Sequence, residues 1–203
     1  LWGGTVLNFG IPNVSVLLLA LVLPPAEIAG FFAAQRTAML MNLFLIAATQ
    51  FAARHVAERH HAGDAAGLAR LARLVAWGTT LPCLALLALF AAAGERVLAL
   101  FGPEFAGAAP VLVILGAGYL AMAVAGPGTT LLTMTGHERA HARILLVVAA
   151  VAVPAIPALA LGFGAAGAAA GLSASMAAIA AASYVAVVRR LRVAPGLFPG
   201  RRG

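Results

Sequence analysis

Apolar residues fill long, almost uninterrupted runs along this chain, and the charged residues gather in the short gaps between the runs. Each run is about 18 residues or longer, which at 1.5 Å per helical residue is enough to cross a hydrocarbon core of about 30 Å. The pattern therefore predicts an all-α integral membrane protein with six transmembrane helices. The runs cover residues 1–23, 28–51, 74–93, 108–134, 144–161 and 165–188.

The composition supports a membrane protein. Hydrophobic residues make up 63% of the 203 residues and charged residues only 9%, whereas a soluble domain keeps about a quarter of its residues charged. The mean hydropathy is +1.02. We predict one six-helix transmembrane lobe over residues 1–193 and a basic cytoplasmic tail over residues 194–203. The runs and gaps use almost the whole chain, so we expect no soluble catalytic domain and no enzyme.

Positive charge is concentrated in alternate gaps. Cytoplasmic loops carry an excess of arginine and lysine, so the second gap, the fourth gap and the C-terminus are predicted to face the cytoplasm. This topology accounts for the net charge of +7, and it makes anionic membrane lipids, rather than nucleic acid, the expected partners. Only Arg96 lies in an odd-numbered gap, and only Arg36 lies inside a run. The other arginines are Arg54, Arg59, Arg70, Arg73, Arg139, Arg143, Arg189, Arg190, Arg192, Arg201 and Arg202.

The second run carries a polar stripe. Gln35, Asn42 and Thr49 are spaced by seven residues, so they share one face of a helix with about 20° of drift per step. Arg36 borders this stripe near mid-depth, where a charge costs about 2.5–3.5 kcal/mol to insert. Intramembrane charges usually face a bundle interior or a water-filled cavity and mark a substrate path.

Two interpretations of Arg36 follow. In the first, its guanidinium binds an anionic substrate, and the stripe, together with Asn8 and Asn13 of the first run, lines the path. In the second, Arg36 is structural and is held by backbone carbonyls or by the two asparagines. Pro12 in the first run, and Pro127 between Gly126 and Gly128 in the fourth, are expected to bend their helices.

Residues 137–141 read His-Glu-Arg-Ala-His and match the zinc-protease pattern H-E-x-x-H. A catalytic zinc needs a third protein ligand, and no His, Asp, Glu or Cys follows His141. Arg139 would oppose a divalent metal between the ligands, and Gly136 indicates a loop. We therefore expect a polar turn without metal. A membrane zinc protease stays an alternative only if a third ligand comes from the second gap, from His55, His60 or His61.

No glycine loop followed by Lys-Ser/Thr is present, so no nucleotide or other cofactor is expected. The sixth run places Gly167, Gly171 and Ser175 four residues apart, a small-residue face that favours close packing of another helix.

Four short segments occur in a recognisable order. Residues 29–32 read Ala-Gly-Phe-Phe and precede Arg36, residues 101–105 read Phe-Gly-Pro-Glu-Phe and precede Ala-Ala-Pro at 108–110, residues 135–139 read Thr-Gly-His-Glu-Arg, and residues 162–169 read Gly-Phe-Gly-Ala-Ala-Gly-Ala-Ala. In this order and spacing they resemble the polysaccharide flippases of the multidrug/oligosaccharidyl-lipid/polysaccharide exporter superfamily.

The resemblance implies the C-terminal lobe of a two-lobe transporter of 12 to 14 helices in the bacterial inner membrane. Such a protein moves an undecaprenyl-linked sugar by alternating access, and Arg36 would bind the pyrophosphate. The chain begins with Leu1, so we interpret it as a fragment that needs an N-terminal lobe, or a second copy. The alternatives are a drug/cation antiporter, which would want a buried carboxylate, and a non-transporting scaffold.

Overall fold

The computed structural model describes residues 23–191 and residue 195, and this part of the chain is all-helical. The first run, with Asn8, Pro12 and Asn13, lies outside the described residues, as does almost all of the tail at 194–203. The described helices are α2 (Pro25–His61), α3 (Ala65–Ala99), the 3-10 helix η1 (Pro103–Ala108), α4 (Ala109–Ala125), α5 (Gly128–Met134) and α6 (Glu138–Leu191).

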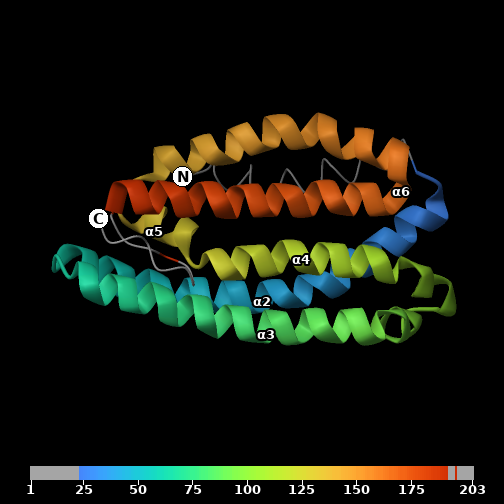
Figure 1. The fold of residues 1–203 in the computed structure, drawn as a ribbon, viewed down its shortest axis with the longest axis horizontal. Helices are drawn as coiled ribbons and strands as arrows, with labels where there is room; N and C mark the ends of the chain where they lie inside the picture. Colours follow the sequence, from blue (N-terminus) through green and yellow to red (C-terminus); the bar gives the residue numbers. More distant parts are fainter. Residues whose placement is uncertain (1–22, 192–194, 196–203) are drawn as a thin grey trace.

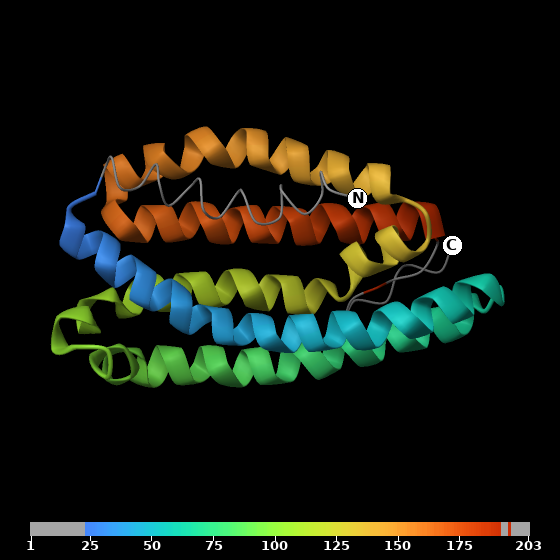
Figure 2. The ribbon, with the colours of Figure 1, turned by 180° about the vertical axis from the view of Figure 1, so that it is seen from behind.

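These helices lie side by side in one elongated bundle (Figure 1). Helix α4 occupies the middle and contacts α2, α3 and α6. Helix α6 doubles back on itself, so its two arms run antiparallel along one side of the bundle, as both views show (Figure 2). The turn falls at Gly164, whose φ of 61° and ψ of −148° are essentially restricted to glycine.

Four of the described helices are long and apolar enough to cross a membrane, rather than the six expected. One reason is that the first run is outside the described residues. The other is that the fifth and sixth runs form the two arms of α6, which is continuous except at Gly164. The chain is thus a multi-pass, all-helical protein by the length and composition of its helices.

The predicted break in the fourth run is confirmed. Helix α4 ends at Ala125, Gly126 has a φ of 73°, and α5 begins at Gly128. Pro127 has no N–H to continue the helical ladder, and the Gly128 amide donates 2.8 Å to the Gly126 carbonyl instead of to a carbonyl four residues earlier. The α4–α5 junction is therefore a discontinuous helix within an apolar run.

Small residues set the spacing between helices. A Cβ added to Gly167 would collide with the Leu159 carbonyl, and one added to Gly171 would lie 2.9 Å from Ile156 Cγ1. These contacts join the two arms of α6, so the predicted packing role of the small-residue face is confirmed for both glycines. Ser175 instead donates a 2.8 Å hydrogen bond to the Gly171 carbonyl of its own helix.

Helix α2 buries one face and exposes the other. Phe31, Ala34, Ala38 and Met41 recur at helical spacing and are fully buried against α3, α4 and α6. The opposite face carries large exposed apolar side chains, as do α3 and α6, so much of the outside of the bundle is apolar. On α2 these include Met39, Leu40, Leu43, Phe44, Ile46 and Phe51.

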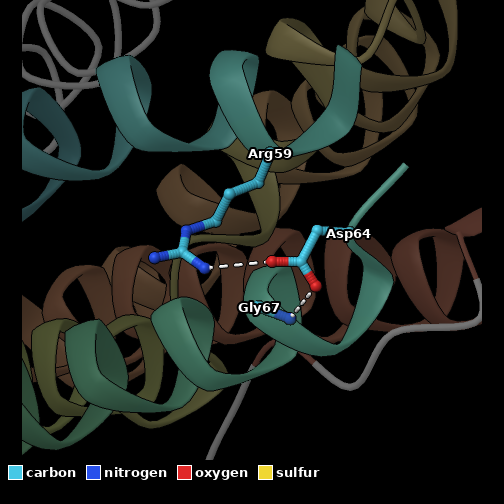
Figure 3. Close-up of polar contacts among 3 residues, drawn as sticks. All are labelled: Arg59, Asp64 and Gly67. Carbon is cyan, nitrogen blue, oxygen red and sulfur yellow. Dashed lines mark hydrogen bonds and ion pairs between the residues drawn. The ribbon is translucent and has the colours of Figure 1, made fainter. Parts of the chain in front are cut away.

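A tight turn at Gly63 and Asp64 joins α2 to α3. Gly63 adopts a φ of 68°, and Asp64 caps α3 by accepting a 2.7 Å hydrogen bond from the Gly67 amide. The other carboxylate oxygen of Asp64 lies 3.2 Å from Arg59 Nη1 (Figure 3). This ion pair ties the end of α2 to the start of α3.

The described arginines other than Arg36 and Arg96 all lie at one end of the bundle. This end holds the α2–α3 turn and both ends of α6, whereas η1, the start of α2 and the Gly164 turn lie at the other end (Figure 1). The fold thus gathers the second gap, the fourth gap and the end of the sixth run on one side, as the arginine pattern requires.

Candidate functional site

The polar stripe of α2 lies along the edge between its buried and exposed faces. Gln35 and Asn42 are half-buried, and Thr49 is exposed. Arg36 is exposed and points away from the core, next to Met39 and Leu40. The structure therefore keeps these side chains on one helix but spreads them over some 14 residues, about 20 Å along its axis.

The Arg36 guanidinium has no carboxylate partner among residues 23–191. Among the described residues, its Nη1 lies 4.0 Å from the sulfur of Met39, and this weak acceptor is no substitute for a counter-ion. In the described part of the chain, Arg59 and Asp64 form an ion pair, and this pair lies at the end of the bundle. Arg36 thus presents a cation on an otherwise apolar outer face.

All six carboxylates of the sequence lie in the described region, and all are exposed. Each is close to the end of a helix or in a connection between helices. No carboxylate is therefore buried at mid-depth to carry a proton or to neutralise Arg36. The residues are Glu27, Glu58, Asp64, Glu95, Glu104 and Glu138.

A small cavity of about 60 Å³ lies at the α4–α5 junction. Its lining includes Thr49 of α2, Thr79 of α3, Thr129 of α5 and Ser183 of α6, beside Pro127. Thr49 is thus the residue of the predicted stripe that reaches the helix break. Four helices supply a hydroxyl to this cavity, although its walls are mainly apolar side chains.

Two of these hydroxyls differ in their hydrogen bonding. Thr79 Oγ1 donates 2.9 Å to the Val75 carbonyl of its own helix. Ser183 is only 1% exposed, and its hydroxyl has no hydrogen-bond partner among the described residues. A buried hydroxyl beside a cavity of this size can be satisfied by water. Sequence reasoning missed Thr79 and Ser183, because a lone hydroxyl in an alanine-rich helix carries no pattern.

The structure places the H-E-x-x-H segment at a helix start. His137 precedes α6, its carbonyl accepts hydrogen bonds from the amides of Ala140 and His141, and its Nδ1 lies 3.1 Å from Thr135 Oγ1. His141 is half-buried in the first turn. Among the described side chains, which do not include those of His60 and His61, no three His, Cys, Asp or Glu group as metal ligands. The expectation that this segment holds no zinc stays a prediction.

No family model, curated protein or solved structure matches this chain. The site must therefore be judged on its own chemistry. It offers one unneutralised guanidinium on a membrane helix, a line of amide and hydroxyl groups on the same helix, and a mainly apolar cavity with four hydroxyls at a helix break. This arrangement can bind an anion and polar groups attached to it, and it contains no nucleophile paired with a base.

Proposed function

We propose that this chain is the C-terminal lobe of a flippase that moves an undecaprenyl-linked oligosaccharide or polysaccharide precursor across the bacterial inner membrane. The observation that carries the proposal is the exposure of Arg36 on α2 without a counter-ion. In this interpretation the two arms of α6 and the first run complete six crossings. The arginine-rich end of the bundle faces the cytoplasm, following the positive-inside rule.

The cost of burying charge gives the first argument. An arginine that faces lipid at mid-depth costs about 2.5–3.5 kcal/mol on the insertion scale, and all-atom calculations give higher values. The part of α2 around Arg36 is therefore expected to face a polar space rather than acyl chains. A second lobe, supplied by an N-terminal half or by another copy, would enclose that space against α2.

The identity of the ligand follows from the residues around this cation. A guanidinium matches phosphate oxygens with a planar fork of donors. Gln35 and Asn42 lie on one side of the same helix, and their amides can hydrogen-bond sugar hydroxyls. A lipid-linked sugar combines a pyrophosphate, a glycan and an isoprenoid chain, and only such a ligand uses the anion site, the polar stripe and the surrounding membrane together.

The helix break supports a moving lobe. Discontinuous transmembrane helices are a recurrent feature of transporters that work by alternating access. The α4–α5 junction has lost helical hydrogen bonds at Pro127 and borders a cavity of about 60 Å³. Bending there, with α2, α3 and α6 packed as one body, would let the cytoplasmic end open and close.

A drug/cation antiporter of the same superfamily is the alternative transporter. It would need a carboxylate within the membrane to exchange protons or bind a cationic drug. All six carboxylates of this chain are exposed near the helix ends, and the one mid-depth charge is positive. The geometry therefore favours an anionic substrate.

The test is complementation of a flippase-null bacterial strain by the whole protein that carries this lobe. Arg36→Ala is expected to abolish complementation at an unchanged level in the membrane fraction, since the substitution removes an insertion cost. Arg96→Ala, which removes an exposed arginine near the other end of the bundle, is the matched control and should complement. Full complementation by Arg36→Ala would overturn the proposed substrate site.

A further inference from the structure

A hollow of about 490 Å³ opens between the last turns of α2 and the first turns of α3. It belongs to the arginine-rich end of the bundle and lies outside the site described above. Its lining includes Arg59 and Arg70, with His55, Asp64, Phe51 and Leu74. Figure 3 shows two residues of this lining, Arg59 and Asp64, and the ion pair between them.

The lining changes from charged to apolar with depth. Arg59 and Asp64 lie at the α2–α3 turn, whereas Phe51 lies ten residues before the end of α2 and therefore about 15 Å farther along the bundle. Leu74 lies at a similar depth on α3. Phe51 is 49% and Leu74 63% exposed, so both present apolar surface to the outside.

A second, apolar groove continues from the hollow. It measures about 300 Å³ and shares Phe51 and Leu74 with the hollow, and it extends along Phe44 and Ala47 of α2 to Gly78 of α3. A Cβ added to Gly78 would meet no atom within 4 Å, so the groove is open at that point. Together the two depressions form a charged head and an apolar tail along one helix pair.

The donors of the head remain available. Asp64 is already bonded to the Gly67 amide and to one nitrogen of Arg59, which leaves the other N–H groups of that guanidinium free for another acceptor. Arg70 is exposed and has no ion pair within residues 23–191. His55 donates from Nδ1 to the Phe51 carbonyl at 3.0 Å, because a carbonyl can only accept. The net charge of the lining is positive.

We propose that this hollow and groove bind one anionic phospholipid of the surrounding bilayer. Its headgroup phosphate lies between Arg59 and Arg70, and one acyl chain follows the groove past Phe51 and Leu74 to Gly78. Two guanidinium groups supply the charge-assisted hydrogen bonds that a phosphate accepts. The apolar groove selects a lipid over a free phosphate, because only a lipid fills both depressions. The inference stands independently of the proposed transport function.

Trp77 provides a reporter for this lipid. It is 53% exposed and lies one helical turn from Leu74 on α3. The chain has two tryptophans, so Trp2→Phe leaves Trp77 as the only one. The chain is reconstituted in vesicles, and quenching of Trp77 by brominated phosphatidylglycerol is compared with quenching by brominated phosphatidylcholine. We expect phosphatidylglycerol to quench at a lower mole fraction.

Matched variants separate this site from general surface charge. Arg59→Gln and Arg70→Gln are each expected to weaken the preference for phosphatidylglycerol about fivefold, the usual contribution of one arginine near an anionic membrane surface. Arg96→Gln, near the other end of α3, should leave the preference unchanged. Gly78→Leu should weaken binding of the long-chain lipid at an unchanged helix content, because its side chain fills the open groove.

Three results would overturn the inference. One is equal quenching by the two lipids, and another is a loss of preference with Arg96→Gln as large as that with Arg70→Gln. The third is full displacement of brominated phosphatidylglycerol by inorganic phosphate, which would show that the head binds a free anion without help from the groove.

Discussion

Ser173 of α6 donates a 2.6 Å hydrogen bond from its hydroxyl to the backbone carbonyl of Ile114 in α4. The two helices can approach this closely because Gly118 faces the same serine. A Cβ on Gly118 would lie 2.9 Å from Ser173 Cα, a separation that real Cβ atoms do not adopt. This contact fixes the second arm of α6 against the middle helix of the bundle.

Ser173→Ala is expected to lower the free energy of unfolding in detergent by about 0.5–1.5 kcal/mol, the range found for interhelical hydrogen bonds in membranes. Ser175→Ala is the matched control, because the Ser175 hydroxyl bonds to the Gly171 carbonyl of its own helix. Equal stability of the two variants in chemical denaturation would show that the Ser173 bond contributes nothing beyond a local one.

Gly164→Ala is expected to destabilise the protein by about 1–3 kcal/mol, because φ of 61° with ψ of −148° lies in a region open essentially to glycine. The control is Gly162→Ala two residues earlier, where an added Cβ meets no atom within 4 Å. Thermal unfolding followed by circular dichroism measures both variants. A Gly164→Ala protein as stable as Gly162→Ala would contradict the turn between the two arms of α6.

The orientation of the bundle can be tested by labelling single cysteines on intact cells. Cys83 is the only cysteine and is buried, so Cys83→Ala gives a silent background. Cysteines at Glu27 and Glu104 should react with an impermeant maleimide added outside, and a cysteine at Glu58 should react only after permeabilisation. The reverse pattern would place the arginine-rich end outside the cell and refute the proposed topology.

The sequence predicted local features of the fold well where single residues dictate the backbone. Pro127, which lacks an N–H, interrupts the fourth run where expected. The reversal at Gly164 falls in the gap predicted between the fifth and sixth runs, but the helical residues extend up to this glycine on both sides. Hydropathy marks where an apolar run ends. It does not say how far the helical hydrogen bonds continue toward Gly164, because that depends on how the two arms of α6 pack.

The candidate site was predicted less completely. Spacing alone placed Gln35, Asn42 and Thr49 along one line of α2, but Thr49 lies at the helix break, about 20 Å from Arg36. The surroundings of that break include Thr79 and Ser183, which come from helices distant in the sequence. Which helices surround a cavity is decided by tertiary packing, and no local pattern encodes it.

Purified protein is expected to contain no stoichiometric zinc, because His137 precedes α6 and its ring nitrogen is engaged by Thr135. Elemental analysis after exposure to zinc measures this directly. His137→Ala and His141→Ala should leave the metal content unchanged. A bound zinc that disappears with either substitution would contradict this expectation and favour the protease alternative.

The central claim is that the Arg36 guanidinium binds the anionic part of a lipid-linked sugar. The most direct measurement is flipping of a labelled undecaprenyl-pyrophosphate oligosaccharide by the whole protein in proteoliposomes. We predict that Arg36→Ala slows flipping about tenfold or more, the loss expected for a hydrogen bond to a charged group. Arg36→Lys should retain part of the rate, because the charge survives without the planar fork, and Arg96→Ala should match the unmodified protein. Flipping by Arg36→Ala at the unmodified rate would contradict the account.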